Sequence, residues 1–285
     1  MAELQARPAI SVIMITGNVI EHSPGRAVFE RALQSVAWAG ELIIVDSDSR
    51  DGTRELAARY TDKIWVHPYQ NSLKLQKKIA VTHVTGDWIL WVDADEILPP
   101  ALIAEIQRAA AAPAGPDAYR IHRQHFFVGK LLAHAGEDAP LRLWRRGAGH
   151  WDGPENDEFY VVDHPGVLTT PLEHYSTARL ADRLHKIAYF SPAHAAKAEL
   201  PPHPDYSGRD VWRWIVKPTL QRLYGVYWLE RGYKDGVRGL IWSVLCAINV
   251  FYVHVLVWER AQTEARNPKA AEEADPEAMN APARS

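Results

Sequence analysis

Short apolar runs alternate with amphipathic stretches along the first third of the chain. Runs rich in β-branched and aromatic residues predict strands at 9–16, 41–47, 62–68 and 87–92. Apolar residues at helical spacing predict helices at 29–39, 50–60, 73–84 and 99–112. Strands that alternate with helices in this way indicate an α/β fold with a mostly parallel sheet covered on both faces.

Polar clusters follow three of these predicted strands. They lie at Thr16–Asn18, Asp46–Asp51 and Asp93–Glu96. The carboxyl ends of parallel strands meet at one edge of a sheet, and ligands bind in the crevice beyond that edge. We therefore expect the three clusters to share one rim.

The pattern changes after the proline- and glycine-rich break at 113–116. Partial period-two alternation at 117–129 and 139–146 predicts antiparallel strands that complete the sheet. Residues 180–198 predict a helix around a break at Pro192, and the proline-rich "PPHPD" (201–205) indicates a boundary.

Composition excludes several classes of protein. The chain has 285 residues, of which 47% are hydrophobic and 24% charged, values typical of a globular protein. A formal net charge of −3 argues against nucleic acid as the main partner. A single cysteine, Cys246, excludes an internal disulfide framework and suits a reducing compartment. The short run 9–16 lacks a cleavage pattern and is better explained as a buried strand than as a signal peptide.

The stretch "WILWVDADEILPP" (88–100) ends an apolar strand in three carboxylates. Asp93 and Asp95 are hard oxygen ligands of the kind that Mg²⁺ and Mn²⁺ favour, and Mg²⁺ commonly shares its ligands with phosphate oxygens. An alternative is that Asp93 and Glu96 cap the helix that starts near Pro99. The tripeptide alone does not decide between the two.

The order of three motifs resembles the family 2 glycosyltransferases. The motifs are "SVIMITGN" (11–18), "ELIIVDSDSRDGTRELA" (41–57) and "VTGDWILWVDADEILPPALIAEI" (84–106). Further stretches, "DAYRIHRQHFFVG" (117–129), "LRLWRRGAGHW" (141–151) and "LERGYKDGVRGL" (229–240), are similar to the branch that adds a sugar to the inner core of bacterial lipopolysaccharide, the core β-glucosyltransferases.

The resemblance implies a GT-A fold (nucleotide-diphospho-sugar transferase) and a division of the chain. The glycosyltransferase domain is expected at 1–200, with a nucleotide half at 9–112 and an acceptor half at 117–200. A helical membrane-associating region at 201–261 follows. The composition of 262–285, rich in Ala, Glu, Pro and Asn, separately predicts a disordered tail. The implied activity is inverting transfer from a UDP-sugar to a lipid-linked glycan acceptor, with Mg²⁺ or Mn²⁺ neutralising the departing UDP.

The resemblance also assigns roles to single residues. Asp46 is implied to accept the uracil N3–H, Asp93 to contact the ribose or metal side of the nucleotide, and Asp95 to hold the metal. The residues implied to bind the nucleotide-sugar are Thr16, Asn18, Asp46, Ser47, Lys77, Asp93, Arg142 and Arg145. Arg142, Arg145 and Arg146 match phosphate oxygens bidentately, although a basic surface strand would explain them equally well.

Inverting transfer needs a base for the acceptor hydroxyl. Asp138 occupies the position where this branch carries an acid, so it is the first candidate. Glu158 lies near a glutamate of the family and is the second, and Glu137 stays open. A solvated loop carboxylate would explain any one of these acids equally well.

The chain also departs from the family pattern. Asn18 is followed by Val19 and Ile20 where the family usually has two acids. Lys78 replaces the usual Asn after Gln76 and Lys77, and Asp157 replaces the histidine before the late glutamate. These changes bear on the donor sugar and the acceptor, and they leave the metal–diphosphate chemistry in place.

Residues 239–258 form a nearly uncharged run of spanning length. The many tryptophans around it and the mixed apolar and basic sequence before it are typical of a segment at a membrane interface. A spanning helix, an interfacial helix and a buried core or dimer helix are the three alternatives, and the polar residues in the run favour the interface over spanning. We expect association with the membrane through 211–258, at the cytoplasmic face of the bacterial inner membrane, peripheral or single-spanning.

Other functions stay open. The same chemistry could act on a polyprenyl phosphate or a peptide. A membrane-bound scaffold that binds nucleotide without turnover is an alternative of another class, motivated by the altered loop after the first strand. Nucleotidyl transfer is disfavoured because no basic glycine-rich phosphate loop lies near that strand.

Overall fold

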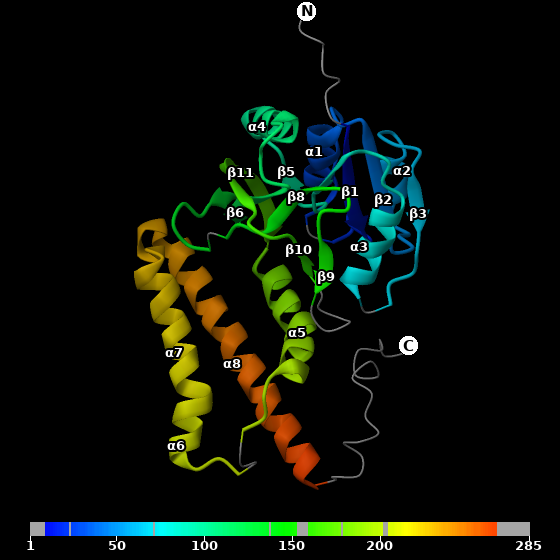
Figure 1. The fold of residues 1–285 in the computed structure, drawn as a ribbon. Helices are drawn as coiled ribbons and strands as arrows, with labels where there is room; N and C mark the ends of the chain where they lie inside the picture. Colours follow the sequence, from blue (N-terminus) through cyan, green and yellow to red (C-terminus); the bar gives the residue numbers. More distant parts are fainter. Residues whose placement is uncertain are drawn as a thin grey trace, which may run out of the picture. The chain divides into compact units, whose positions relative to one another are not determined.

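The computed structural model divides the chain into two compact units (Figure 1). The residues that it describes are 9–22, 24–70, 72–136, 138–152, 159–177, 179–201 and 205–266. Unit 1 comprises Met1–Phe126 and Glu137–Ala178, and unit 2 comprises Phe127–Gly136 and Arg179–Ser285.

Four parallel strands form one half of the unit 1 sheet, and all four were predicted from the apolar runs. They are β1 (Ile10–Thr16), β2 (Glu41–Asp46), β3 (Ile64–Val66) and β4 (Trp88–Trp91). The order is β3-β2-β1-β4, and each neighbouring pair is parallel. The register pairs Thr16 with Asp46, so the carboxyl ends of β1 and β2 meet at one edge of the sheet.

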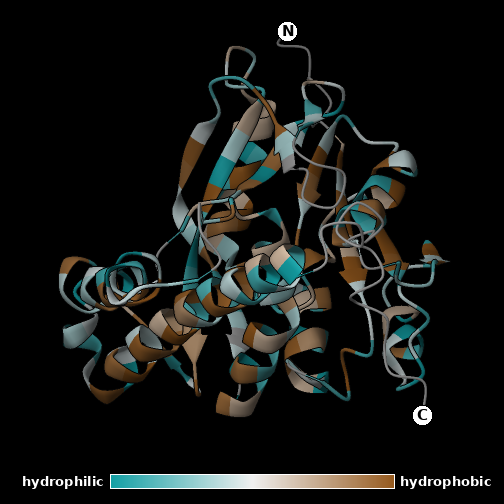
Figure 2. Cartoon of the chain, turned by 90° about the horizontal axis from the view of Figure 1, so that it is seen from below, coloured by the Kyte–Doolittle hydropathy of each residue, from teal (hydrophilic) through white to brown (hydrophobic). Residues whose placement is uncertain are grey.

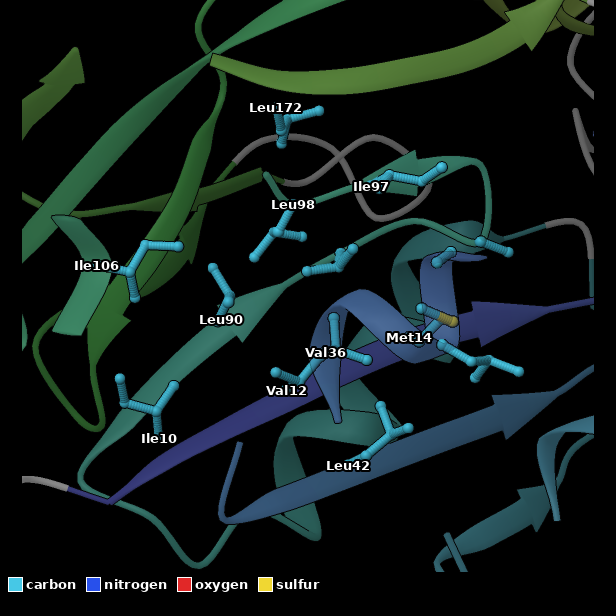
Figure 3. Close-up of a cluster of buried hydrophobic side chains, with 14 of the residues drawn as sticks. Ile10, Val12, Met14, Val36, Leu42, Leu90, Ile97, Leu98, Ile106 and Leu172 are labelled. Carbon is cyan, nitrogen blue, oxygen red and sulfur yellow. The ribbon is translucent and has the colours of Figure 1, made fainter. Parts of the chain in front are cut away.

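Helices cover both faces of this half of the sheet. They are α1 (Arg26–Val36), α2 (Thr53–Ala57), α3 (Leu73–Thr82) and α4 (Pro100–Ala111). Val12 and Met14 of β1 pack in one core cluster with residues of α1, α2 and α4, part of which Figure 3 shows. Ile13, which points to the other face, packs in a second cluster with Ala80 of α3. The three-layer α/β architecture expected from the sequence is thereby confirmed.

Antiparallel strands complete the sheet beyond β4. They are β8 (Leu141–Arg145), β6 (Ala118–Phe127), β11 (Gly166–Thr177) and β5 (Glu96–Ile97). The sequence predicted β6 and β8, and it missed β5 and β11, which pair with each other. A separate two-stranded sheet joins β9 (His150–Asp152) to β10 (Phe159–Val161).

Helices make up most of the described part of unit 2. They are α5 (Leu180–Lys197), α6 (Gly208–Val211), the π-helical turns η1 (Trp212–Val216) and η2 (Gly225–Leu229), α7 (Lys217–Tyr224), the 3₁₀ turn η3 (Gly232–Asp235) and α8 (Gly236–Arg266). A short strand, β7 (Lys130–Leu131), precedes them in the chain.

Three sequence predictions about this region need correction. Helix α5 continues through Pro192 without a break. Helix α5 belongs to unit 2 because it packs along α8. Ser191 hydrogen-bonds Asn249, and the Arg260 guanidinium donates to the Ala195 carbonyl oxygen. The boundary between the units therefore lies before residue 179 and not at residue 200. The tail was expected from 262, but α8 continues to Arg266; residues 267–285 lie outside the described residues.

The segment Phe127–Gly136 is held in unit 2 by a carboxylate. Asp235 accepts hydrogen bonds from the backbone N–H groups of Ala133, His134 and Ala135, at 2.9 to 3.1 Å. Phe127 packs edge-on against Trp242 of α8, with ring centroids 5.4 Å apart. The segment is therefore fixed to the helices although it lies between two stretches of unit 1 in the sequence.

Candidate active site

The ends of β1 and β2 are joined through Asp46. This carboxylate is fully buried and accepts hydrogen bonds from Thr16 Oγ1 at 2.6 Å, Ser49 N at 2.7 Å and Ser49 Oγ at 2.7 Å. The backbone N–H of Ser47 donates to the carbonyl oxygen of Thr16. Both oxygens of Asp46 already accept hydrogen bonds from Thr16 or Ser49. The contact of Asp46 with uracil therefore stays a prediction.

The loop after β1 is fixed to the turn after β2. Asn18, in the left-handed region with φ 46°, accepts a hydrogen bond on Oδ1 from Arg50 N and donates its own N–H to Ser49 Oγ. Val19 N donates to Thr53 Oγ1, and Glu21 N donates to Asp51 Oδ2. Although this loop lacks the usual two acids of the family, its backbone is held in one conformation beside the rim.

Asp93 and Glu96 share one arginine. Arg142 Nη2 donates to Asp93 Oδ2 at 2.7 Å and to Glu96 Oε1 at 2.5 Å, and Glu96 Oε2 accepts from the backbone N–H of Asp93 at 3.0 Å. Glu96 is fully buried and Arg142 is 3% exposed. Helix α4 has Pro99 at its N-cap and no side-chain cap, so the alternative of a helix cap for these acids is wrong.

Burial and charge set the protonation of this group. The Arg142 and Lys77 charges outweigh burial and hold the pKa of Asp93 well below its usual range. Burial and the neighbouring Asp93 charge raise the pKa of Glu96. The two acids raise the pKa of Arg142 against its own burial. The expected role of Arg142 in binding phosphate competes with this buried ion-pair network.

Lys77 lies near Asp93 and stacks on the ring of Trp91 at the end of β4. Its Nζ lies 3.3 Å from the ring centroid of Trp91, and Trp91 Nε1 donates to Asp93 Oδ1 at 2.7 Å. Burial lowers the pKa of Lys77 to about 8, although the Asp93 charge acts in the opposite direction. A partly desolvated ammonium of this kind suits the recognition of a phosphate group.

Asp95 faces a histidine that the sequence did not single out. His174 Nε2 of β11 lies 3.5 Å from Asp95 Oδ2, and the backbone N–H of Tyr175 donates to the Asp95 carbonyl oxygen. Two ligands of one Mg²⁺ or Mn²⁺ ion at about 2.1 Å, with a right angle at the metal, would lie about 3 Å apart. The pair therefore fits a divalent ion after a small adjustment.

Two protein ligands of this kind are sufficient for such an ion. Over the described residues, no group of three or more His, Cys, Asp or Glu side chains could hold a metal ion. Mg²⁺ usually keeps several water ligands and takes one or two carboxylates together with substrate phosphates. The donor set thus suits a metal that binds together with a diphosphate.

Asp138 is paired with two cations or potential cations. Arg123 Nε donates to Asp138 Oδ1 at 2.7 Å, and a second nitrogen of the same guanidinium contacts Oδ2. His125 Nε2 lies 3.5 Å from Oδ1. The hydrogen bonds from Arg123, together with the weaker His125 contact, outweigh partial burial and hold the pKa of Asp138 well below its usual range. A carboxylate stabilised in this way is a weak base, which counts against its first place among the base candidates.

The rim does not include every residue that the sequence nominated. Because β8 runs antiparallel to β4, Arg145 pairs with Trp88, at the opposite end of β4 from Asp93, and bonds Asp117 there. Arg146 donates its backbone N–H to the Asp87 carbonyl oxygen at the same end. The structure therefore does not bring Arg145 to the cluster. Glu158 and Glu137 lie outside the described residues.

Comparison of the sequence with known proteins identifies the family of the chain. The family model described as "Glycosyl transferase family 2" matches residues 11–138. An uncharacterized glycosyltransferase of Rickettsia bellii is 35% identical over 261 residues, covering 83% of this chain and 84% of its own. The chain belongs to glycosyltransferase family 2. It is a glycosyltransferase with the GT-A type of α/β fold, as the sequence predicted.

Other relatives are more distant. The lipopolysaccharide core biosynthesis glycosyltransferase LpsC of Rhizobium meliloti is 25% identical over 251 residues, covering 84% of this chain and 90% of its own. TarS 1–349 of S. aureus is a structural match at 13% identity and a TM-score of 0.40, covering 92% of each chain. Glucosyl-3-phosphoglycerate synthase of Mycobacterium tuberculosis, solved with Mg²⁺ and UDP, matches at 17% identity and a TM-score of 0.35, covering 49% of this chain and 57% of its own. The family assignment depends on the sequence matches alone.

Proposed function

We propose that this glycosyltransferase moves a sugar, with inversion, from a UDP-sugar to a lipid-linked glycan in the presence of Mg²⁺ or Mn²⁺. The observation that carries the proposal is the pairing of Asp95 with His174 on the rim that also holds Asp93. Carboxylate and imidazole ligands beside a buried cation cluster suit a metal–diphosphate complex.

In this proposal, different residues of the chain hold the metal, the diphosphate and the nucleotide of the donor. Asp95 and His174 hold the metal, which when bound supplies the positive charge that stabilises the leaving diphosphate. Lys77, near Asp93, would bind a diphosphate oxygen. The nucleotide end of the crevice is formed by Thr16, Asn18, Asp46 and Ser47.

The acceptor hydroxyl is deprotonated by Glu158 in this proposal. Asp138 is the weaker candidate because Arg123 stabilises its carboxylate. Glu158 lies near the family glutamate in sequence. Replacing Glu158 with Gln is expected to lower turnover by at least 100-fold, on the order expected for a general base. Affinity for UDP and metal should not change.

The metal–nucleotide part can be tested without an acceptor. Calorimetry with UDP and Mn²⁺ should give tight Mn²⁺ binding only when UDP is present. Asp95→Asn and His174→Gln are each expected to weaken Mn²⁺ binding by at least 10-fold. Asp117→Asn is the matched control, because Asp117 is 56% exposed and pairs with Arg145 at the other end of the sheet. Transfer activity that survives both EDTA and Asp95→Asn would contradict the metal-dependent proposal.

The acceptor class needs a separate test. The name of the Rhizobium relative points to the lipopolysaccharide core. Mass spectrometry of lipopolysaccharide from cells with and without the gene should reveal one missing hexose. Intact lipopolysaccharide together with activity on polyprenyl phosphate or a peptide would move the proposal to those acceptors. UDP binding without transfer to any of them would favour a non-catalytic scaffold.

We further propose that unit 2 lies on a membrane. Helix α8 is the part of the described chain that is long and apolar enough to cross a bilayer, by length and composition only. Figure 2 shows the hydrophobic colour recurring along the helices of this unit. One face of α8 exposes apolar side chains at intervals of three, four or seven residues: Val237, Leu240, Val244, Ile248, Phe251 and Trp258.

The helical segment before α8 adds aromatic and basic residues. Its exposed large side chains are Val211, Trp212, Leu220, Tyr224, Trp228, Leu229 and Tyr233. Residues 208–240 contain seven Lys and Arg against three Asp and Glu, which suits a surface of anionic lipids. Aromatic and basic residues around an apolar stripe are typical of a helix that lies in the interface.

Packing within unit 2 favours an interfacial α8 over a spanning one. Helix α5 lies along α8 from Arg183, whose guanidinium is 4.8 Å from the Trp242 ring centroid, to Ala195, whose carbonyl oxygen accepts from Arg260. A spanning α8 would draw α5 and its charged Lys186 into the hydrocarbon, at a cost of several kcal/mol.

Vesicle binding tests this second proposal. In a sedimentation assay, the protein should pellet with vesicles of phosphatidylglycerol. A smaller fraction should pellet with vesicles of phosphatidylcholine alone. Val237→Ser, at a position 65% exposed on α8, is expected to weaken binding several-fold. Val167→Ser is the matched control, because Val167 is 52% exposed but lies on β11 of unit 1. Membrane-bound protein that resists extraction at alkaline pH would contradict the interfacial arrangement and indicate spanning.

A further inference from the structure

A chain of polar contacts leads from Asp138 to Asp95 through two histidines. His125 Nε2 lies 3.5 Å from Asp138 Oδ1, the Nδ1 atoms of His125 and His174 are 3.1 Å apart, and His174 Nε2 lies 3.5 Å from Asp95 Oδ2. We propose that Asp138 and His125 are positioning residues that fix the tautomer of His174 and turn its Nε2 lone pair toward the metal. The inference rests on the proposed function, because it concerns the same metal.

The donor and the acceptor in each contact follow from the chemistry of the two groups. An ionised carboxylate only accepts, so the proton between Asp138 and His125 belongs to His125 Nε2. A neutral imidazole has one donor and one acceptor, so His125 Nδ1 accepts and His174 Nδ1 must donate. His174 Nε2 is then left with a lone pair that faces an oxygen of Asp95.

Two electron-rich atoms at that distance repel each other unless a positive charge lies between them. A divalent ion satisfies both, since neutral imidazole and carboxylate are ordinary ligands for Mn²⁺. A doubly protonated His174 could instead donate to Asp95 directly. The nitrogen shifts of the His174 ring distinguish that imidazolium from the neutral form.

Strand β6 and an isolated bridge to it position this chain of contacts. Arg123 and His125 are two positions apart on β6, so their side chains lie on the same face of the sheet. The backbones of Arg123 and Asp138 form an isolated antiparallel bridge, with Arg123 N donating to the Asp138 carbonyl oxygen at 3.0 Å. Asp138 is thus fixed by its backbone and its side chain, as an orienting group requires.

The role assigned here differs from that of a base in one measurable way. A general base acts on the acceptor, and its loss lowers turnover without changing the affinity for metal. A group that orients a metal ligand changes that affinity, typically by about 10- to 100-fold. The affinity for Mn²⁺ therefore separates the two roles.

Electron paramagnetic resonance can measure free Mn²⁺ in titrations of the full chain with UDP present. His125→Phe, which removes both contacts, is expected to raise the Kd for Mn²⁺ by at least 10-fold. His125→Asn keeps an acceptor for His174 Nδ1 and should recover part of the loss. Asp138→Ala should weaken Mn²⁺ binding, and Asp138→Asn less so, because an amide oxygen still accepts from His125.

The control is His122→Phe, which makes the same substitution on the opposite face of β6 and should leave the Kd for Mn²⁺ unchanged. Wild-type affinity in His125→Phe or Asp138→Ala would overturn the inference while leaving the proposed function intact. Wild-type protein that fails to bind Mn²⁺ with UDP would overturn the proposed function, and the inference with it.

A measurement on the wild type avoids dependence on folded variants. Long-range ¹H–¹⁵N correlation spectra of the histidine rings distinguish the two neutral tautomers from the imidazolium. We expect the Nδ1–H tautomer for His174 and the Nε2–H tautomer for His125 at pH 8. The opposite tautomers, or an imidazolium at His174, would refute the inference.

Discussion

Replacing Arg142 with Met tests whether this arginine holds the acid cluster together. Its guanidinium bonds both Asp93 and Glu96, and it is 3% exposed. The Met side chain occupies a similar volume but carries no charge. Glu96, which is fully buried, then loses its closest cation, whereas the Asp93 side chain is 33% exposed and can be hydrated.

The expected loss comes mainly from Glu96. Removing one partner of a buried ion pair typically costs about 3–5 kcal/mol, since the other charge stays buried without compensation. We expect the lower end, about 3 kcal/mol, because the Asp93 N–H still donates to Glu96 and Arg123 remains 3.6 Å away. The double variant Arg142→Met/Glu96→Gln removes the uncompensated charge and should recover about 2 kcal/mol.

The loss should also depend on pH. Burial raises the pKa of Glu96, and removing Arg142 raises it further. The folded state of the variant therefore binds a proton more tightly than the unfolded chain, so the variant is more stable at low pH and loses stability as the pH rises. The deficit relative to wild type should be smaller at pH 5 than at pH 8.

Hydrogen exchange of the β1 and β4 amides is the suitable assay, because it reports the free energy of opening for unit 1 alone. Circular dichroism of each variant controls for global misfolding. A deficit below about 1 kcal/mol at pH 8, or a double variant no more stable than the single one, would refute the reasoning.

Three further predictions concern unit 1. Hydrogen bonds from Lys63, Ser11 and Thr85 outweigh burial and lower the pKa of Glu41 to about 2. This carboxylate therefore stabilises the fold above pH 4.5, and its contribution is lost as the pH falls from there toward 2. Glu41→Gln should cost about 3 kcal/mol at pH 7 in urea unfolding and show a weaker dependence on acid; an unchanged dependence would contradict this. Lys77→Met should lower the affinity for UDP about 10-fold, as measured by calorimetry. The affinity of the wild-type protein should fall as the pH rises past 8, where Lys77 loses its proton. If Lys77→Met bound UDP as tightly as wild type, Lys77 would be excluded from the diphosphate site. Gly52 has φ 88°, so Gly52→Ala should lower the Tm by several degrees, a loss of about 1–2 kcal/mol; an unchanged Tm would show that the turn can rearrange.

The parallel half of the fold was predictable because its signals are local. Each of its strands is a continuous apolar run, and the clusters after β1 and β2 meet on one rim, as the rule for parallel strands requires. The rule needs only the order of the elements and no distances.

The second half of the site was not predictable in the same way. Strand β5 has only two residues, Glu96 and Ile97, and it exists because β11 pairs with it. Strand β11 contains Pro171 and a mixed polar sequence, so its pattern is weak. His174 meets Asp95 only through this pairing. The alternation in "PLEHYST" (171–177) was the one signal that could have drawn attention to it.

The positions of the arginines depended on register. Arg142 and Arg145 are three positions apart on β8, so their backbones lie near opposite ends of β4. One reaches the acids and the other bonds Asp117. Nothing in the sequence states which residue of β8 pairs with which residue of β4, so both were nominated.

The crossings between the two units determine how the protein can be dissected. The chain passes between them after Phe126, after Gly136 and after Ala178. A fragment that ends at residue 178 would keep the segment Phe127–Gly136 but lose Asp235, which accepts three of its backbone N–H groups. The first two crossings fall between His125 and Asp138 in the sequence. A fragment truncated at residue 178 would therefore be disturbed close in sequence to His125 and Asp138, so enzymology needs both units.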